Sequence, residues 1–184
     1  MRFVKLTIVA FLAIVAAWAG AVPRPAPPLS LPTTHGERIS LEDYRGKVVL
    51  LKFFLTDCPH CQRSAATIMP IYKEWRSRGM EVLAVAINPD AASKIPDFIQ
   101  RFGVTYPIVM GGRSSLTSFA DLSVVSRFFV PYMFLIDRQG VIRFEHPGGD
   151  AFYQNEDQNL RTELDALLKE PARAARKTSR RASK

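Results

Sequence analysis

The run Val48–Leu55 constrains the fold of this chain more than any other segment. It is apolar except for Lys52, which is the composition of a strand buried on both faces of a sheet. Apolar residues then recur at helical spacing from Pro59 until Gly79, and Met80–Ile87 is a second apolar strand. Strand, helix and strand in this order predict a right-handed crossover between parallel strands.

The middle of the chain continues this pattern. Ala91–Phe102 is predicted to be a helix that ends at Gly103, and Tyr106–Met110 a short strand. Residues 111–129 are poorly patterned, and we expect a loop with one helix there.

The C-terminal part predicts a hairpin and a closing helix. Pro131–Asp137 and Val141–Glu145 are two strands joined by a short turn. The helix is marked by an apolar stripe of Leu160, Leu164, Leu167 and Leu168. The predicted fold class is therefore α/β, with three layers and a central mixed sheet flanked by helices.

The N-terminal segment, residues 1–21, has the features of a signal peptide or an N-terminal anchor. Two positive charges precede the apolar core Leu6–Ala17, and small residues follow it. The apolar stretch 6–22 reaches only the lower limit of length for a membrane span, so cleavage and anchoring both remain open. We expect an exported protein, periplasmic or extracytoplasmic, released or anchored to the inner membrane.

Charge is concentrated at the C-terminus. We predict a Pro-rich linker at 22–28, one folded domain at 29–168 and a disordered basic tail at 169–184. The tail holds seven basic residues against one acidic residue, a large part of the net charge of +8. We expect a monomer without a nucleic-acid partner, and the tail or the N-terminal anchor could contact a membrane.

Cys58 and Cys61 are the only cysteines of the chain, and they stand where the first buried strand gives way to a helix. A helix N-terminus has unpaired N–H groups and the positive end of the helix dipole, which stabilise a thiolate at Cys58. Pro59 suits the first helical position, because no N–H donor is needed there. The pattern predicts Cys58 as the nucleophile and Cys61, one turn later, as the resolving thiol.

Three charged neighbours are expected to tune the pair. A protonated His60 adds positive charge, whereas Asp57 opposes it unless its side chain points to water. Lys52 is predicted to stabilise thiolates by charge attraction. The alternative for Lys52 is an aliphatic stem packed in the sheet, with its ammonium group reaching water.

Two other interpretations of the pair are weaker. A tetrahedral zinc site needs two more ligands, and the candidates are only His35, His60 and His146. A purely structural disulfide would close too small a loop to stabilise the chain much. We therefore predict no metal and no other cofactor.

Several stretches of the sequence resemble the thioredoxin superfamily, specifically its exported TlpA/ResA-like branch in the AhpC/TSA–redoxin clan. They are Ile39–Phe54, Cys58–Cys61, Pro70 and Val130–Ile142, in the order of that family and within residues 28–168. The resemblance implies a thiol-disulfide oxidoreductase with a reversible Cys58–Cys61 disulfide. Its substrates would be protein thiols or disulfides, and an unidentified redox partner would reset the pair.

The resemblance also gives roles to residues far from the cysteines. It implies that Pro131 is a cis-proline facing the disulfide and that the Val130 backbone pairs with an extended substrate segment. Proline is tolerated there because it starts a strand. The Cys-Pro-His-Cys motif and the valine before the proline look like the oxidising DsbA family, so Pro59 and His60 are expected to tune the potential.

Two departures from these relatives bear on the direction of electron flow. Lys52 stands where thioredoxin has a buried aspartate, and Ser64 stands where ResA-like proteins have a glutamate. The proton-transfer carboxylates of both relatives are therefore missing from the sequence pattern. Lys52 would favour the reduced form of the pair, so we expect the protein to oxidise the thiols of its partners.

Two other functions are alternatives for this sequence. A peroxiredoxin-like peroxidase shares the order of elements, but Leu55 occupies the threonine position of its Pro-x-x-x-Thr-x-x-Cys site. A Sco-like copper-delivery protein has three residues between its cysteines and a histidine ligand before the late strand pair. The only downstream histidine here, His146, comes after the hairpin.

Overall fold

The computed structural model describes residues 21–171 of the chain. The predicted signal or anchor segment, apart from residue 21, and the tail from residue 172 lie outside the described residues. In the part that is described, no helix combines the length and apolarity needed to cross a membrane.

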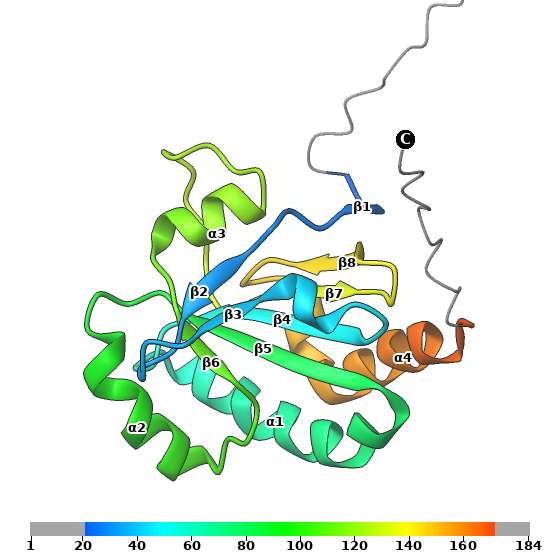
Figure 1. The fold of residues 1–184 in the computed structure, drawn as a ribbon, viewed down its shortest axis with the longest axis horizontal. Coiled ribbons are helices and arrows are strands. Elements are labelled where there is room, and N and C mark those ends of the chain that lie inside the picture. Colours follow the sequence, from blue (N-terminus) through cyan, green and yellow to red (C-terminus); the bar gives the residue numbers. More distant parts are fainter. Residues whose placement is uncertain (1–20, 172–184) are drawn as a thin grey trace, which may run out of the picture.

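A six-stranded mixed sheet forms the centre of the molecule, with the strand order β1-β8-β7-β4-β5-β6 (Figure 1). The neighbours β4, β5 and β6 run parallel, whereas β4–β7, β7–β8 and β8–β1 are antiparallel pairs. The strands are β1 (Arg24–Pro25), β4 (Val48–Phe54), β5 (Met80–Ala86), β6 (Ile108–Met110), β7 (Tyr132–Ile136) and β8 (Val141–His146). A separate antiparallel hairpin consists of β2 (Ser30–Pro32) and β3 (Arg38–Ser40).

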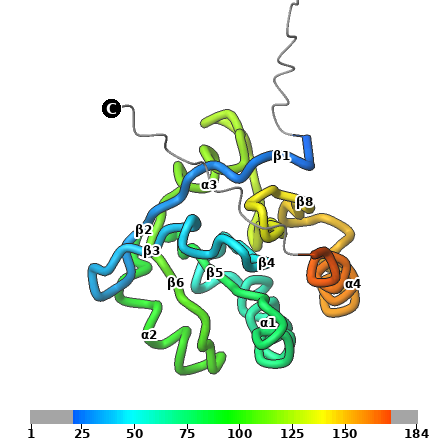
Figure 2. Tube along the Cα trace, turned by 45° about the vertical axis from the view of Figure 1, so that its right-hand side comes forward, coloured from blue at the N-terminus to red at the C-terminus, as the bar shows by residue number. Residues whose placement is uncertain are grey.

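Helices cover both faces of the sheet. They are α1 (Pro59–Trp75), α2 (Ala91–Phe102), α3 (Arg113–Phe119) and α4 (Glu156–Lys169). Figures 1 and 2 show α1 and α4 side by side on one face, with α3 and the β2–β3 hairpin on the other. Short 3-10 turns occupy Leu41–Tyr44, Arg76–Arg78 and Ala151–Asn155. The three-layer α/β prediction is confirmed.

The two faces of β4 explain where Lys52 lies. Val48, Leu50 and Phe54 pack into the core beneath α1, α2 and α4. The alternate residues of the strand pack toward α3 and the β2–β3 hairpin. Because side chains alternate along a strand, Lys52 belongs to the first face and is directed beneath the helix that carries the cysteines.

Sequence and structure agree most closely in the part of the chain that forms the parallel strands β4, β5 and β6. The predicted helix Ala91–Phe102 is α2, residue for residue, and it ends at Gly103, whose positive φ of 60° a glycine adopts without strain. The predicted strands at 48–55 and 80–87 each end one residue earlier in the structure. The predicted strand Tyr106–Met110 is shorter, because only Ile108–Met110 pairs with β5.

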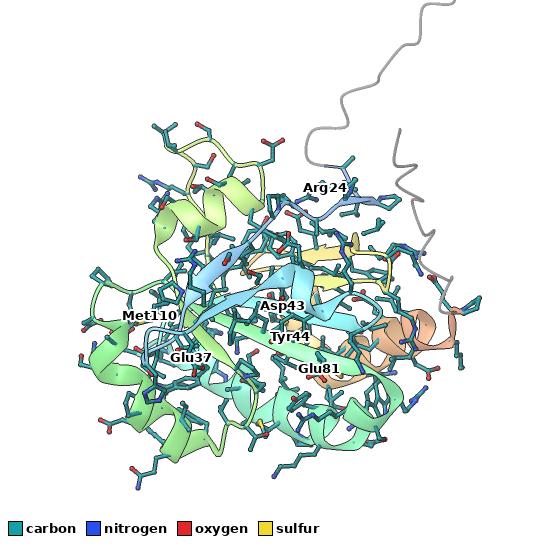
Figure 3. All side chains as sticks on the ribbon, in the orientation of Figure 1. Arg24, Glu37, Asp43, Tyr44, Glu81 and Met110 are labelled. Atoms are coloured by element: carbon teal, nitrogen blue, oxygen red, sulfur yellow. The ribbon has the colours of Figure 1, made fainter. Side chains whose placement is uncertain are left out.

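Part of the predicted linker joins the sheet. Arg24 of β1, labelled in Figure 3, pairs with Ile142 of β8. Its buried guanidinium donates to the Glu145 carboxylate over 2.5 Å. The Tyr132 hydroxyl donates to the same carboxylate over 2.6 Å. This buried ion pair fixes β1 on the domain, so the chain enters the sheet before the predicted domain boundary at residue 29.

Candidate active site

The first cysteine lies at the start of α1, as the sequence predicts. Pro59 is the first residue of the helix and Cys58 its N-cap, and the Cys58 carbonyl accepts a hydrogen bond from the Gln62 N–H over 3.0 Å. The Cys58 side chain is half-buried, and its Sγ donates to the Val130 carbonyl oxygen over 3.8 Å. The unpaired N–H groups of the helix end are therefore next to a sulfur that a partner can reach.

Cys61 has the opposite environment. Its side chain is fully buried, at 0% exposure, on the core-facing side of α1. Burial raises the pKa of the Cys61 thiol to about 12, and the nearby Lys52 ammonium partly opposes this shift. A hydrogen bond between the two cysteine side chains also raises that pKa. Cys61 therefore holds its proton at neutral pH, directly beneath the accessible Cys58.

The segment before β7 closes the other side of the site. The Val130–Pro131 peptide bond is cis, which agrees with the conformation that the resemblance implied. The Tyr153 hydroxyl lies 2.7 Å from the Pro131 carbonyl oxygen and 2.8 Å from that of His146, so it ties this segment to β8. The substrate roles of Val130 and Pro131 stay predictions.

Lys52 lies inside the protein. It is 1% exposed, and its Nζ donates to the Cys61 carbonyl oxygen over 3.0 Å. Burial lowers the pKa of Lys52 to about 8, while Cys61 and Glu156 act in the opposite direction. The alternative in which its ammonium group reaches water is wrong, because the register of β4 directs this side chain beneath α1.

Glu156, the first residue of α4, was missed by the sequence analysis. Its carboxylate accepts a hydrogen bond from the Ser64 hydroxyl over 2.6 Å, across a sequence separation of 92 residues. Burial raises the pKa of Glu156, and the Ser64 hydrogen bond and Lys52 lower it. A carboxylate therefore does approach the site, from another helix. The available signal was Ser64, a buried hydroxyl on an apolar helix face that needs a partner.

The charges beside Cys58 lie at the surface. The guanidinium of Arg63 is 2.8 Å from Nδ1 of His60, and because a guanidinium can only donate, Nδ1 is the acceptor. Asp57 is 62% exposed, and its carboxylate lies 3.3 Å from Nζ of Lys94. The Asp57 charge is therefore partnered and solvated. The predicted tuning role of His60 remains a prediction.

A cavity of about 450 Å³ lies beside His60 and Val130, the neighbours of Cys58. Its wall combines the start of α1, the segment before β7 and the start of α4, and it includes His60, Phe129, Pro131, Tyr153 and Glu156. Phe129 is 70% exposed, so an apolar side chain stands at the surface beside the cavity. This space is large enough to receive side chains of a bound peptide segment.

The surroundings of His146 do not favour the copper-delivery alternative. His146 Nε2 lies 2.8 Å from the Glu163 carboxylate, and the ring stacks on Phe152 with centroids 3.7 Å apart. Within residues 21–171, no three His, Cys, Asp or Glu side chains gather as a metal site would require.

Comparison with known proteins shows the family to which this chain belongs. The model of the AhpC/TSA family matches residues 22–145. The chain belongs to the AhpC/TSA family. Among curated relatives, the thiol-disulfide oxidoreductase ResA of Geobacillus kaustophilus is 33% identical over 125 residues, which cover 68% of each chain. ResA of Bacillus subtilis is 31% identical over 117 residues, covering 64% of this chain and 62% of the relative.

Solved structures support the same family placement. A thiol:disulfide interchange protein of the thioredoxin family from Chlorobium tepidum has a TM-score of 0.65 and is 25% identical, covering 80% of this chain and 98% of its own. A second Chlorobium tepidum protein, described as a putative DsbE, has a TM-score of 0.62 and shares the fold. The chain is a TlpA/ResA-like thiol-disulfide oxidoreductase with a thioredoxin-like fold, so the predicted family, fold and activity are confirmed.

Proposed function

We propose that this enzyme exchanges disulfides with proteins outside the cytoplasm, with Cys58 as the nucleophile and Cys61 as the resolving thiol. The observation that carries the assignment is the unequal burial of the two sulfurs. Cys58 is half-buried at the N-terminus of α1, whereas Cys61 is fully buried one turn later. A partner can therefore reach one sulfur and not the other.

The exchange proceeds in two balanced steps. The Cys58 thiolate attacks one sulfur of a partner disulfide, forms a mixed disulfide and releases the other partner sulfur as a thiolate. Cys61 then loses its proton and attacks Sγ of Cys58. The Cys58–Cys61 disulfide forms, and the second partner thiolate leaves with the electron pair of the broken bond. Donation of a disulfide to partner thiols is the reverse sequence.

The wall opposite the helix supports a role in substrate binding. Val130 places its carbonyl oxygen beside Sγ of Cys58, so an extended partner segment pairing there would bring its own sulfur to the nucleophile. Pro131 and Phe129 line the adjoining cavity, which would take a neighbouring partner side chain.

The buried lysine favours donation of disulfides as the working direction. The ammonium group of Lys52 lies in a low-dielectric interior, and its charge interacts with Cys58 as well as with Cys61. Positive charge there favours a thiolate at Cys58 and therefore the reduced pair. A pair that favours its reduced form is a stronger oxidant of others. We expect a reduction potential closer to about −120 mV than to about −270 mV.

Export is supported by the charged and apolar pattern of residues 1–21. Contact with a membrane, a monomeric state and a separate protein that resets the pair belong to the same proposal.

Turnover of a peptide with one disulfide, or of its dithiol form, tests the function. Cys58→Ser should abolish turnover, and Cys61→Ser should accumulate the mixed disulfide with the peptide. Undiminished turnover by Cys58→Ser would contradict the mechanism. Rapid peroxide consumption without peptide would instead support the peroxidase alternative.

A further inference from the structure

Three elements bring ionisable groups together beneath the redox pair. Lys52 comes from β4, Cys61 from α1 and Glu156 from α4. Lys52 donates to the Cys61 backbone, and its charge interacts with both Cys61 and Glu156. Glu156 is bonded to the Ser64 hydroxyl. The arrangement is a cluster of one cation, one carboxylate and one thiol, largely shielded from water.

The resolving step sets a requirement that this cluster must meet. Cys61 attacks only as a thiolate, but burial raises the pKa of its thiol to about 12, so the protonated form dominates at pH 7. Lys52 stabilises the thiolate, but below its pKa of about 8 it is protonated and has no lone pair to accept the proton. Another group must therefore receive it.

Ser64 connects Glu156 to the helix face that carries Cys61. Cys61 and Ser64 are three residues apart on α1 and therefore lie on the same helix face, and Ser64 is bonded to the Glu156 carboxylate. Glu156 also lines the 450 Å³ cavity, whereas Cys61 and Ser64 are fully buried. The carboxylate therefore links the interior of the site with a space open to solvent.

Charge balance favours the same assignment. Before the transfer the cluster contains a carboxylate, an ammonium group and a neutral thiol, and afterwards a neutral carboxyl, an ammonium group and a thiolate. Its net charge is zero in both states. A transfer that leaves the net charge unchanged avoids adding an uncompensated charge to a low-dielectric interior.

We propose that Glu156 accepts the proton of Cys61 during the resolving step, while Lys52 stabilises the thiolate that forms. The proposal rests on the roles of Cys58 and Cys61 in the proposed function. The Cys61 S–H proton moves to the Glu156 carboxylate, the Cys61–Cys58 bond forms, and the Cys58–partner bond breaks with its electron pair on the partner thiolate. Glu156 then releases the proton into the cavity, and in the reverse direction it returns the proton to Cys61.

A chromophoric aromatic disulfide separates the two chemical steps in one experiment. Attack by Cys58 on the reagent releases one coloured thiolate in a phase that depends on reagent concentration. Attack by Cys61 on the mixed disulfide releases the second in a concentration-independent phase, which is the resolving step itself. The rate of this second phase is measured in the reduced full chain from pH 4 to pH 8.

In the wild type, the rate of the second phase should be independent of pH near neutrality. It should fall as the pH drops through the pKa of Glu156, because only the ionised carboxylate accepts a proton. In Glu156→Gln the pH-independent region should be lost. The rate should then rise about tenfold per pH unit and lie about 100-fold below wild type near pH 6. The first phase should change little.

Three further variants complete the test. Ser64→Ala removes a hydrogen bond that lowers the pKa of Glu156, so the fall in rate should move to higher pH while the pH-independent rate is retained. Asp157→Asn removes the same charge from the next residue of α4, which is 57% exposed. Because the Asp157 charge raises the pKa of Glu156, Asp157→Asn should move the fall in rate to lower pH, opposite to Ser64→Ala. Asp165→Asn is the matched control that should keep the wild-type profile, since Asp165 lies on the same helix, is paired with Arg78 and is not among the groups that shift the pKa of Glu156.

A pH-independent second phase in folded Glu156→Gln would overturn the proposal, as would an unshifted profile in Ser64→Ala. The Ser64→Ala arm decides the matter if Glu156→Gln does not fold. Failure of the proposed function has a different signature, because the wild type itself would then release only one coloured thiolate per chain.

Discussion

The surroundings of Cys58 and of Cys61 differ more than their separation by two residues suggests. The polar neighbours of Cys58 are at the surface, where the Asp57 carboxylate is paired with Lys94 and the His60 ring is bonded to Arg63. Cys61 is fully buried above the ammonium group of Lys52. Charges in water are screened within a Debye length, whereas charges in the interior are screened far less. We therefore propose that the accessible half of the site meets partners and that the buried half controls protonation.

The largest effect should come from the buried half, at Lys52, where stability and resolution by Cys61 change together. Burial lowers its pKa from 10.5 to about 8, which corresponds to a cost of about 3 kcal/mol for keeping the charge inside. Lys52→Met removes that cost, but it also removes one hydrogen bond and the positive charge beside Glu156. We therefore expect a smaller net stabilisation, about 1 kcal/mol at pH 7, with slower resolution by Cys61. Denaturant unfolding measures the change.

The same variant has a defined pH dependence. Unfolded Lys52 keeps its proton up to about pH 10.5, but the folded protein releases it near pH 8, so wild-type stability rises across this interval. The advantage of Lys52→Met should therefore shrink from pH 8 to pH 10.5. Lys47→Met, at an exposed lysine just before β4, should change stability little at any pH. Destabilisation by Lys52→Met at pH 7 would contradict the account of the buried half.

A smaller effect on turnover is expected at the wall beside the accessible sulfur. Tyr153→Phe removes the hydroxyl that lies between the Pro131 and His146 carbonyls. We expect the free energy of unfolding to fall by about 1 to 2 kcal/mol. Peptide turnover should fall several-fold, because the segment next to Cys58 loses its tie to β8. Tyr72→Phe is the matched control, since that hydroxyl bonds Glu81 away from the cavity. An equal loss of turnover in both variants would show that only general stability had changed.

The smallest effect should come from the exposed charge before Cys58. Asp57→Asn should change peptide turnover by less than about twofold at physiological salt, because the carboxylate is solvated and paired with Lys94. Turnover measured at low and high salt checks this expectation. A tenfold change in turnover at high salt would show that the surface charge of Asp57, rather than the buried groups beneath α1, sets the reactivity of the pair.

Local patterns were enough to predict the crossover and the cysteine pair. The run beginning at Val48 had to be buried on both faces, and Pro59 marked the start of α1 correctly. The conformation of Pro131 was reached only through resemblance to a family, since nothing in its neighbours requires a cis bond.

Contacts between distant segments could not be predicted. The apolar stripe from Leu160 to Leu168 predicts α4 but does not indicate that its first residue, Glu156, lies beside Ser64. Arg24 was predicted to belong to a linker, because local sequence gives no sign of its partner Glu145, which is 121 residues away. Lys52 was ambiguous for a related reason: a strand pattern gives the face of a side chain, while the covering helices decide whether its charge reaches water.

The difference between the two sulfurs is tested most directly by the two single-cysteine variants. Because the chain has no other cysteine, Cys61→Ser leaves only Cys58 and Cys58→Ser leaves only Cys61. Each is mixed with the same peptide disulfide at pH 7, and mass spectrometry follows the rate at which the mixed disulfide forms. The account predicts that the variant retaining Cys58 reacts at least about 100-fold faster, since Cys61 is buried and protonated. Equal rates, or faster reaction at Cys61, would contradict it.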